Sequence, residues 1–203
     1  MARKAYSAQE RERVREALLT TVLQCIVDRG LIHSSIEVLS KKVGISKSFF
    51  YSFFPSKEEL VLQALRYQQP RLLRYARELM DDPSLSWREG VKTFLRSCCD
   101  GAKNGIAVLS MEEEQAIFRC LSKESFQAFR ADQLALYEAI LAIFGIAPGK
   151  IDPRLFGNLA LEMMMVQKAI PDSLPFLFPE AAEAMAEFQI DALADALQRA
   201  RDL

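Results

Sequence analysis

Residues 35–60 read SIEVLSKKVGISKSFFYSFFPSKEEL, and this stretch decides the fold. Ser35 is a good helix N-cap, and the apolar residues after it recur at helical spacing until Gly44, which permits a tight turn. Ser46 caps a second short helix immediately. Pro55 ends that helix, because a proline pushes the residue before it out of the α region. The stretch therefore predicts two short helices joined by a tight turn.

A longer amphipathic helix precedes this pair. Apolar or small residues recur at three-and-four spacing from Val14 to Ile26, and Gly30 can supply the left-handed residue that ends the helix. Three helices of these lengths, the last two joined by Val43-Gly44-Ile45, have the dimensions of a helix-turn-helix. In such a unit the second short helix, here Ser46–Phe53, lies in the major groove of duplex DNA.

The polar residues of the second short helix then have chemical roles. Lys47 and Ser48 lie at the end that approaches the base edges, where an ammonium or a hydroxyl can donate to guanine or to a phosphate. The phenol of Tyr51 can donate to a phosphate oxygen, and Lys57 adds its charge to the positive N-terminus of the next helix. The structural alternatives are a core aromatic for Tyr51 and a solvated side chain for Lys57.

Charge is distributed unevenly along the 203 residues, which carry 26 Lys and Arg against 27 Asp and Glu. Residues 1–57 hold ten basic and five acidic side chains, a net charge of +5, which leaves −6 for the remainder. A polyanion is the expected partner of the basic end, and the acidic remainder should face a different partner.

These residues resemble the DNA-binding signature of the TetR family of one-component transcriptional regulators. The resemblance rests on Gly44-Ile45-Ser46-Lys47, Tyr51 and Phe54–Leu60, and it covers roughly the first 60 residues. The remainder agrees with the family only in length and helical content. The resemblance implies that an operator is faced by Ser35, Ser46, Lys47, Ser48, Phe49, Tyr51 and Lys57.

The sequence departs from the family's pattern within the second short helix. Similar proteins commonly have a small residue at position 48, threonine at 49, leucine at 50 and histidine at 53, where this chain has Ser48, Phe49, Phe50 and Phe53. Phe50 should still be core. Phe49 can contact a thymine methyl but lacks the threonine hydroxyl, and Phe53 lacks a phosphate donor. Glu37 either accepts from a cytosine amino group or points away from the DNA.

The remaining sequence predicts helices only. Capping boxes, in which a serine and a glutamate three residues later satisfy each other's backbone donors, open three of them. The boxes are Ser56 with Glu59, Ser86 with Glu89, and Ser110 with Glu113. The first of these helices should bend at Pro70, Asp152-Pro153 should open another helix, and the last should run from Pro179 to Arg201. Pro171 and Pro175 should mark the turn before it.

The fold class is therefore all-α. We expect an N-terminal three-helix helix-turn-helix domain over residues 1–56 and a larger helical ligand-binding and dimerisation domain over residues 57–203. A protein that reads a palindromic operator must present the reading helix twice, so we expect a homodimer. The last two helices offer interdigitating residues for it, as the resemblance also implies: Leu155, Leu159, Met163, Val166, Met185, Phe188, Ala192 and Ala196.

In similar proteins, the helices between these two regions enclose an inducer pocket. The candidate lining residues are mostly apolar, which favours a small apolar effector of unknown identity. They are Trp87, Phe94, Cys98, Met111, Phe118, Phe126 and Tyr137. The two helix-turn-helix units of the dimer, its reading heads, must lie about one duplex turn apart, ~34–36 Å. A bound effector would shift the helix that starts at Lys57 and so change this separation.

Four other features allow two interpretations each. Glu112-Glu113-Glu114 either attracts a cationic ligand or is a favourable first helical turn after Ser110. Met163-Met164-Met165 either lines an adaptable cavity or belongs to an ordinary core. Cys98-Cys99, with Cys120, forms a thiol sensor or consists of buried small hydrophobes. His33 contacts a phosphate or is a plain loop residue.

We expect a ligand-responsive DNA-binding regulator, a repressor that an apolar effector releases from a palindromic operator. The alternative is a DNA-binding dimer without an effector, whose C-terminal domain serves only dimerisation or partner docking. An enzyme is not expected, because the chain has one histidine and no glycine-rich phosphate loop. No cofactor or metal site is expected. With no membrane span or secretory signal in the sequence, we expect a cytoplasmic chain.

Overall fold

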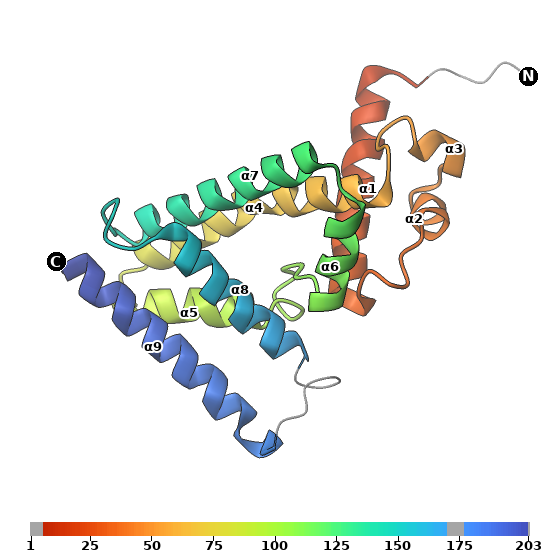
Figure 1. The fold of residues 1–203 in the computed structure, drawn as a ribbon. Coiled ribbons are helices and arrows are strands. Elements are labelled where there is room, and N and C mark those ends of the chain that lie inside the picture. The colour runs from red at the N-terminus through yellow and green to blue at the C-terminus, as the bar shows by residue number, and fades with distance from the viewer. Residues whose placement is uncertain (1–5, 170–176, 203) are drawn as a thin grey trace, which may run out of the picture.

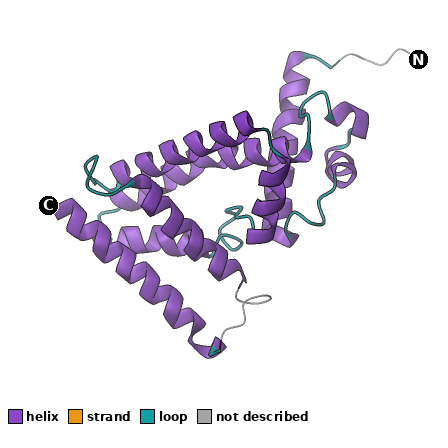
Figure 2. Cartoon of the chain, viewed as in Figure 1, coloured by secondary structure: helices purple, strands orange, loops and turns teal. Residues whose placement is uncertain are grey.

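The computed structural model describes residues 6–169 and 177–202 (Figure 1). Every regular element of this part of the chain is a helix (Figure 2), which confirms the all-α prediction. The α-helices are α1 (Ala8–Arg29), α2 (Ile36–Val43), α3 (Lys47–Phe50), α4 (Lys57–Asp81), α5 (Trp87–Cys99), α6 (Met111–Cys120), α7 (Lys123–Ile143), α8 (Pro153–Ala169) and α9 (Ala182–Asp202). A 3-10 turn at Pro179–Ala181 comes directly before α9. The predicted turn at Pro171 and Pro175 lies outside the described residues.

The helix-turn-helix forms for the local reasons that the sequence predicts. The hydroxyl of Ser35 accepts from the Val38 N–H at the start of α2, and Gly44 ends that helix in the left-handed conformation with φ 77°. Ser46 accepts from the Phe49 N–H and opens α3. The predicted length of this helix is wrong, because the α-helix ends at Phe50. The chain continues there as turns, in which the N–H groups of Ser52 and Phe53 bond three residues back, to the carbonyls of Phe49 and Phe50.

Two of the three predicted capping boxes, those opened by Ser86 and Ser110, are complete. The box at Ser56 is only half formed. Its hydroxyl accepts from the Glu59 N–H at 3.2 Å, but the Glu59 carboxylate accepts from the hydroxyl of Ser125 in α7 instead of returning to the N-cap backbone. A distant partner therefore replaces the local one, and it fastens α4 to α7.

Two hydrophobic clusters form the interior, and α4 belongs to both. The first joins the buried face of α1 to Phe50 and Phe54, and it takes in Leu60–Ala64 of α4 together with residues of α6 and α7. The second packs α5, α7, α8 and α9 against the other half of α4, where Ala76 is fully buried. The core of the N-terminal unit therefore extends past residue 56.

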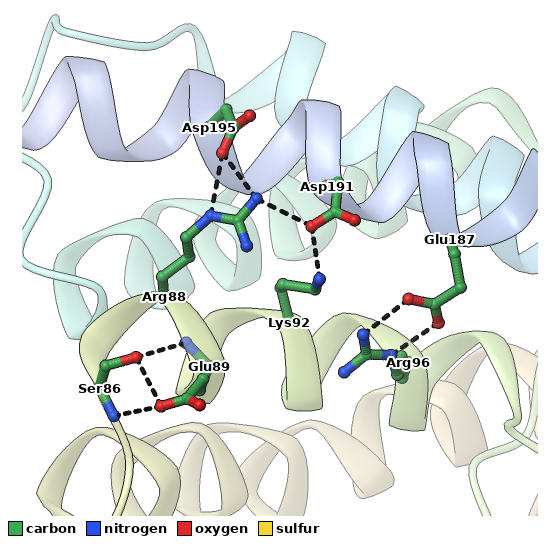
Figure 3. A network of polar contacts seen from close by, with 8 residues as sticks. All are labelled: Ser86, Arg88, Glu89, Lys92, Arg96, Glu187, Asp191 and Asp195. Atoms are coloured by element: carbon green, nitrogen blue, oxygen red, sulfur yellow. Dashed lines mark hydrogen bonds and ion pairs between the residues drawn. The ribbon is translucent and has the colours of Figure 1, made fainter.

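The arrangement separates the two ends of the molecule. Figure 1 shows α1, α2 and α3 at one end, with α4 running from them beside α7, and α8 and α9 towards the other end. The α4 helix continues through Pro70 without a break. Ion pairs fasten α5 to α9 along their length (Figure 3). No helix among the described residues combines the length and the apolar character that crossing a bilayer requires.

Candidate DNA interface and ligand cavity

The residues expected to read DNA lie at the surface of α2 and α3. Ser35, Ser46, Lys47 and Ser48 are exposed, and the hydroxyls of Ser46 and Ser48 lie 3.0 Å apart. Tyr51, at the end of α3, is 50 % exposed while its ring packs edge-on against the buried Phe50. These side chains form the candidate DNA interface. Glu37 is exposed as well, and both interpretations of it remain open.

Phe49 occupies a different environment from its neighbours. Its ring is half-buried and stacks on Tyr6 with 4.6 Å between ring centroids, with the edge of Phe53 beside it. The guanidinium of Arg11 lies 4.7 Å from the Phe53 ring centroid and donates to the carbonyl of Ser52 at 3.0 Å. Tyr6 thus covers part of the apolar surface that Phe49 would offer a thymine methyl. Arg11 brings a cation beside Phe53, a contact that the charge pattern of the sequence does not reveal.

Lys57 has a partner within the chain. Its ammonium donates to the carbonyl of Leu31, in the connection between α1 and α2, at 3.3 Å. The side chain is half-buried rather than fully solvated. A phosphate contact by Lys57 remains a prediction, and the ammonium would share its three donors between the phosphate and Leu31.

The other peptide group of Leu31 is held from the second half of the molecule. Glu113, only 5 % exposed, accepts from the Leu31 N–H and, through its second oxygen, from the Ser110 N–H at 2.7 Å. Lys168 of α8 approaches that second oxygen to 3.4 Å and donates to the carbonyl of Val108. We name Glu113, Leu31, Lys57 and Lys168 the Leu31 clamp, because they join α6, α8 and α4 to the helix-turn-helix unit.

The Glu113 carboxylate stays charged in this buried place. Burial acts to raise its pKa, but the N–H donors of Ser110 and Leu31 and the charge of Lys168 together outweigh burial and lower it. Gly30 makes the approach possible, since a Cβ there would lie 2.6 Å from the nearer carboxylate oxygen, and its φ of 74° suits glycine. No sequence signal beyond the capping box indicated this role, because Leu31 lies 82 residues away.

A cavity of about 140 Å³ lies between α4, α5, α6, α7 and α8, with a predominantly apolar lining. Four of the seven predicted effector residues line it: Phe94, Cys98, Phe118 and Tyr137. Met163, Met164 and Met165 line it as well. Their position agrees with the interpretation that the methionines line an adaptable cavity.

The other three predicted effector residues do not line the cavity. The indole N–H of Trp87 donates to the carbonyl of Phe144 at 2.8 Å, on the side of α5 towards the end of α7. Met111 is exposed at the start of α6. Phe126 packs edge-on against Phe118, outside the lining.

The cysteines of α5, Cys98 and Cys99, have poorly reactive thiols. Burial raises the pKa of the Cys98 thiol to about 12 and that of Cys99 to about 11. Both thiols therefore stay protonated near neutral pH, where a thiolate would be needed for reaction. This environment favours the interpretation as small hydrophobes. Among the described residues no group of three or more His, Cys, Asp or Glu side chains is arranged to hold a metal ion.

The residues expected at a dimer interface differ in their exposure to solvent: some are exposed, some half-buried and one buried. Leu155 and Leu159 of α8 and Phe188 of α9 are large apolar side chains exposed to solvent, and Ala192 is exposed as well. Val166, Met185 and Ala196 are half-buried. Met163 is a correction to this set, because it is buried and faces the cavity of its own chain.

Two short helices joined at a left-handed glycine, with a polar exposed face on the second, place the N-terminal unit in the helix-turn-helix class. Residues 18–64 match the family model described as "Bacterial regulatory proteins, tetR family". This match shows that residues 18–64 resemble the DNA-binding region of TetR-family regulators.

Individual relatives match over part of the chain. The chain is 31 % identical over 86 residues to the HTH-type transcriptional regulator EthR of Mycobacterium tuberculosis, and the match spans 40 % of either chain. It is 38 % identical over 50 residues to the uncharacterized HTH-type transcriptional regulator YuxN of Bacillus subtilis, which is 25 % of this chain and 17 % of that one. The crystal structure of SCO4454, a TetR-family regulator from Streptomyces coelicolor, superposes with a TM-score of 0.57 at 17 % identity, covering 94 % of this chain and 97 % of that one. This last likeness is one of fold.

Proposed function

We propose that the protein is a transcriptional regulator that binds a palindromic operator as a homodimer and releases it when a small ligand enters the cavity between α4 and α8. The observation that carries the proposal is the exposed polar surface of α3, beside α2, in a helix-turn-helix held together by the buried Leu39, Phe50 and Phe54. Repression rather than activation follows the usual behaviour of the family. The proposal places the protein in the cytoplasm, together with the DNA.

In the proposed complex α3 lies in the major groove. Lys47 and Ser48 reach base edges or adjacent phosphates, and the phenol of Tyr51 donates to a phosphate oxygen. Ser35 and Ser46, at the starts of their helices, bring backbone N–H groups and the positive ends of helix dipoles towards the DNA backbone. Arg11 adds a cation to the same end of the molecule.

The Leu31 clamp gives the cavity a route to the DNA-reading unit. Glu114, next to Glu113, lines the cavity, and so do Val108, whose carbonyl accepts from Lys168, and Met164 and Met165 of α8. A ligand that shifts α6 would therefore move Glu113, which accepts from the Leu31 N–H, and one that shifts α8 would move Lys168, which contacts Glu113. Because Lys57 starts α4 and also holds Leu31, the same shift reaches α4. Ligand binding would then favour a different separation of the two reading heads.

The competing candidate is a DNA-binding dimer whose C-terminal helices serve only dimerisation. The cavity favours the ligand-responsive regulator, because an apolar space bounded by five helices and lined by methionines is suited to adaptable binding.

The DNA-binding part of the proposal predicts a specific loss in Tyr51→Phe. Selection of bound fragments from a random DNA pool first gives the operator and its symmetry. Fluorescence anisotropy on that operator should then show about fivefold weaker binding by Tyr51→Phe, the loss of one hydrogen bond of about 1 kcal/mol.

Tyr67→Phe is the matched control, since Tyr67 of α4 is 44 % exposed, against 50 % for Tyr51, and lies outside the candidate DNA interface. It should bind like the unmodified protein. Equal affinity of both variants would reject the phosphate contact of Tyr51, and a pool that yields no enriched sequence would reject specific DNA binding altogether.

A further inference from the structure

Glu114 is the one charged side chain among the described residues that line the cavity. It follows Glu113 in the first turn of α6, and the two carboxylates differ in their partners. Lys168 and two N–H groups compensate Glu113. In the part of the chain that the structure describes, no lysine or arginine lies within ion-pair distance of Glu114. Lys168 therefore pairs with Glu113 and not with Glu114.

Glu114 is half-buried, so its carboxylate has lost part of its hydration. The lining around it is formed mainly by leucine, phenylalanine and methionine side chains, and burial raises the pKa of Glu114. An ionised group without a countercharge in such surroundings is unfavourable, so a cation that entered the cavity would be stabilised beside it.

Uncharged polar groups accompany Glu114 in the lining. The amide of Gln68 is satisfied by both backbone groups of Ala107, with distances of 3.0 and 3.1 Å. The side-chain nitrogen of Gln69, by contrast, is buried without a partner among the described residues. Tyr137 adds a phenol. This cavity therefore offers polar contacts to an occupant as well as an apolar wall.

We propose that the effector is a small amphipathic amine, whose protonated amino group pairs with the Glu114 carboxylate while its apolar body contacts Phe94, Phe118 and the methionines. The inference rests on the proposed function in taking the cavity as the effector site. It replaces the expected apolar effector with a cationic one. A volume of about 140 Å³ admits a body of roughly one aromatic ring, because an apolar cavity of about 150 Å³ accommodates benzene. The methionines can rearrange for somewhat larger bodies.

The charge of Glu114 separates this class from its alternatives. A carboxylic acid of the same shape would bring a second negative charge into the cavity, which is unfavourable at short range. An alcohol of that shape would gain only a neutral hydrogen bond, which is weaker than a charge-assisted one. The expected order of affinity is therefore amine, then alcohol, then carboxylate.

Isothermal titration calorimetry with three probes of nearly equal size tests this order: benzylamine, benzyl alcohol and benzoate. The unmodified protein should bind benzylamine at least about tenfold more tightly than benzyl alcohol, and benzoate most weakly. Glu114→Gln, which keeps the shape of the side chain, should lose the preference for the amine while still binding the alcohol. Glu112→Gln is the matched control, because Glu112 is exposed outside the cavity, and it should retain the preference.

The three probes on the unmodified protein decide the inference even if Glu114→Gln fails to fold. Equal affinity for amine and alcohol, or a preference for benzoate, would overturn the cationic effector and leave the cavity as a ligand site. If neither these probes nor 2-phenylethylamine and 2-phenylethanol bind, the cavity is no site for an amine of this size and the ligand-responsive part of the proposed function fails with it. Operator binding, measured separately, would stand in either case.

Discussion

Leu31 is the residue through which α6 and α4 contact the connection between α1 and α2. Its N–H is bound by Glu113 of α6 and its carbonyl by Lys57 of α4, so both ends of its backbone are fixed by side chains from other elements. A backbone group in a loop normally finds water. Here the position of the connection between α1 and α2 depends on α6, and the N-terminal unit is coupled to the cavity wall.

Glu113→Gln is expected to lower the free energy of unfolding by about 1–3 kcal/mol at pH 7. The amide removes the charge, and its nitrogen cannot accept from either backbone donor, which leaves a buried N–H without a partner. Chemical denaturation with urea, followed by circular dichroism, measures the change. Glu112 is exposed, so Glu112→Gln should leave the free energy of unfolding nearly unchanged.

The pH dependence of that difference follows from the lowered pKa of Glu113. Its ordinary value is 4.5, and the folded-state pKa lies below it. The carboxylate therefore stabilises the fold fully above pH 4.5, and this contribution is lost as the pH falls through the lower folded-state pKa. The two proteins should converge in stability below pH 4.5. A gap that stays constant across this range would contradict the clamp.

The sequence predicts the local contacts of single residues but misses the distant ones. Ser35, Gly44 and Ser46 act on backbone groups within four residues, so the pattern around each of them is sufficient. Glu59 and Glu113 have the same local signature, a glutamate three residues after a serine. Only tertiary packing decides that Glu59 bonds Ser125 and that Glu113 also bonds Leu31.

Among the elements, α5 is held on two faces. One face contributes Phe94, Leu95 and Cys98 to the cavity. Another face carries the cations of a polar ladder to α9, in which Asp191 accepts from both Arg88 and Lys92 (Figure 3). Further contacts join Arg88 to Asp195 at 2.8 Å and, bidentately, Arg96 to Glu187 at 2.6 Å. The ladder thus fixes one wall of the cavity to the last helix.

Asp191→Asn should lower the melting temperature at low salt, because it removes the one carboxylate shared by Arg88 and Lys92. Asp191 and Arg88 are exposed to solvent while Lys92 is mostly buried, and the effect should fade as salt is raised and screens the exposed charges. Differential scanning fluorimetry across a salt series measures it. Glu183→Gln, on the exposed face of α9, serves as the control and should show no salt-dependent loss. A loss independent of salt would indicate a packing defect instead of a broken ion pair.

Helix positions could be predicted because caps, prolines and apolar spacing are local signals. The cavity lining was recovered in part for a related reason. Phe94, Cys98, Phe118 and Tyr137 fall on buried faces, whereas the orientation of Trp87 depends on its bond to the Phe144 carbonyl. The ladder could not be predicted, since nothing in the spacing of the charges on α5 reveals which helix lies opposite.

On the scale of the whole molecule, an exposed apolar surface lies far from the reading unit. Leu155 and Leu159 on α8 and Phe188 on α9 remain in contact with solvent in the single chain, and Figure 1 shows these two helices away from α2 and α3. Large apolar side chains of this kind on neighbouring helices are typical of interfaces. The predicted pairing through α8 and α9 would cover them and leave both α3 helices free for the DNA.

Phe188→Glu is expected to raise the dimer dissociation constant by about 30-fold or more, the loss of about 2 kcal/mol for a central aromatic side chain. Sedimentation velocity over a concentration series measures the change. Ile32→Glu is a matched control, because Ile32 has the same 73 % exposure and lies outside α8 and α9, in the connection between α1 and α2. If Phe188→Glu and Ile32→Glu both leave the dimer intact, the interface lies elsewhere.

Because α4 supplies Leu60–Ala64 to the core of the N-terminal unit, that unit is not a detachable module. Recombination between related genes at the boundary before Lys57 would pair one parent's reading head with another parent's core residues, and the mismatch would create voids or overpacking. A chimera joined beyond Ala64 keeps this part of the core from one parent. Specificity for DNA and specificity for ligand can then be exchanged between such proteins only along a junction inside α4.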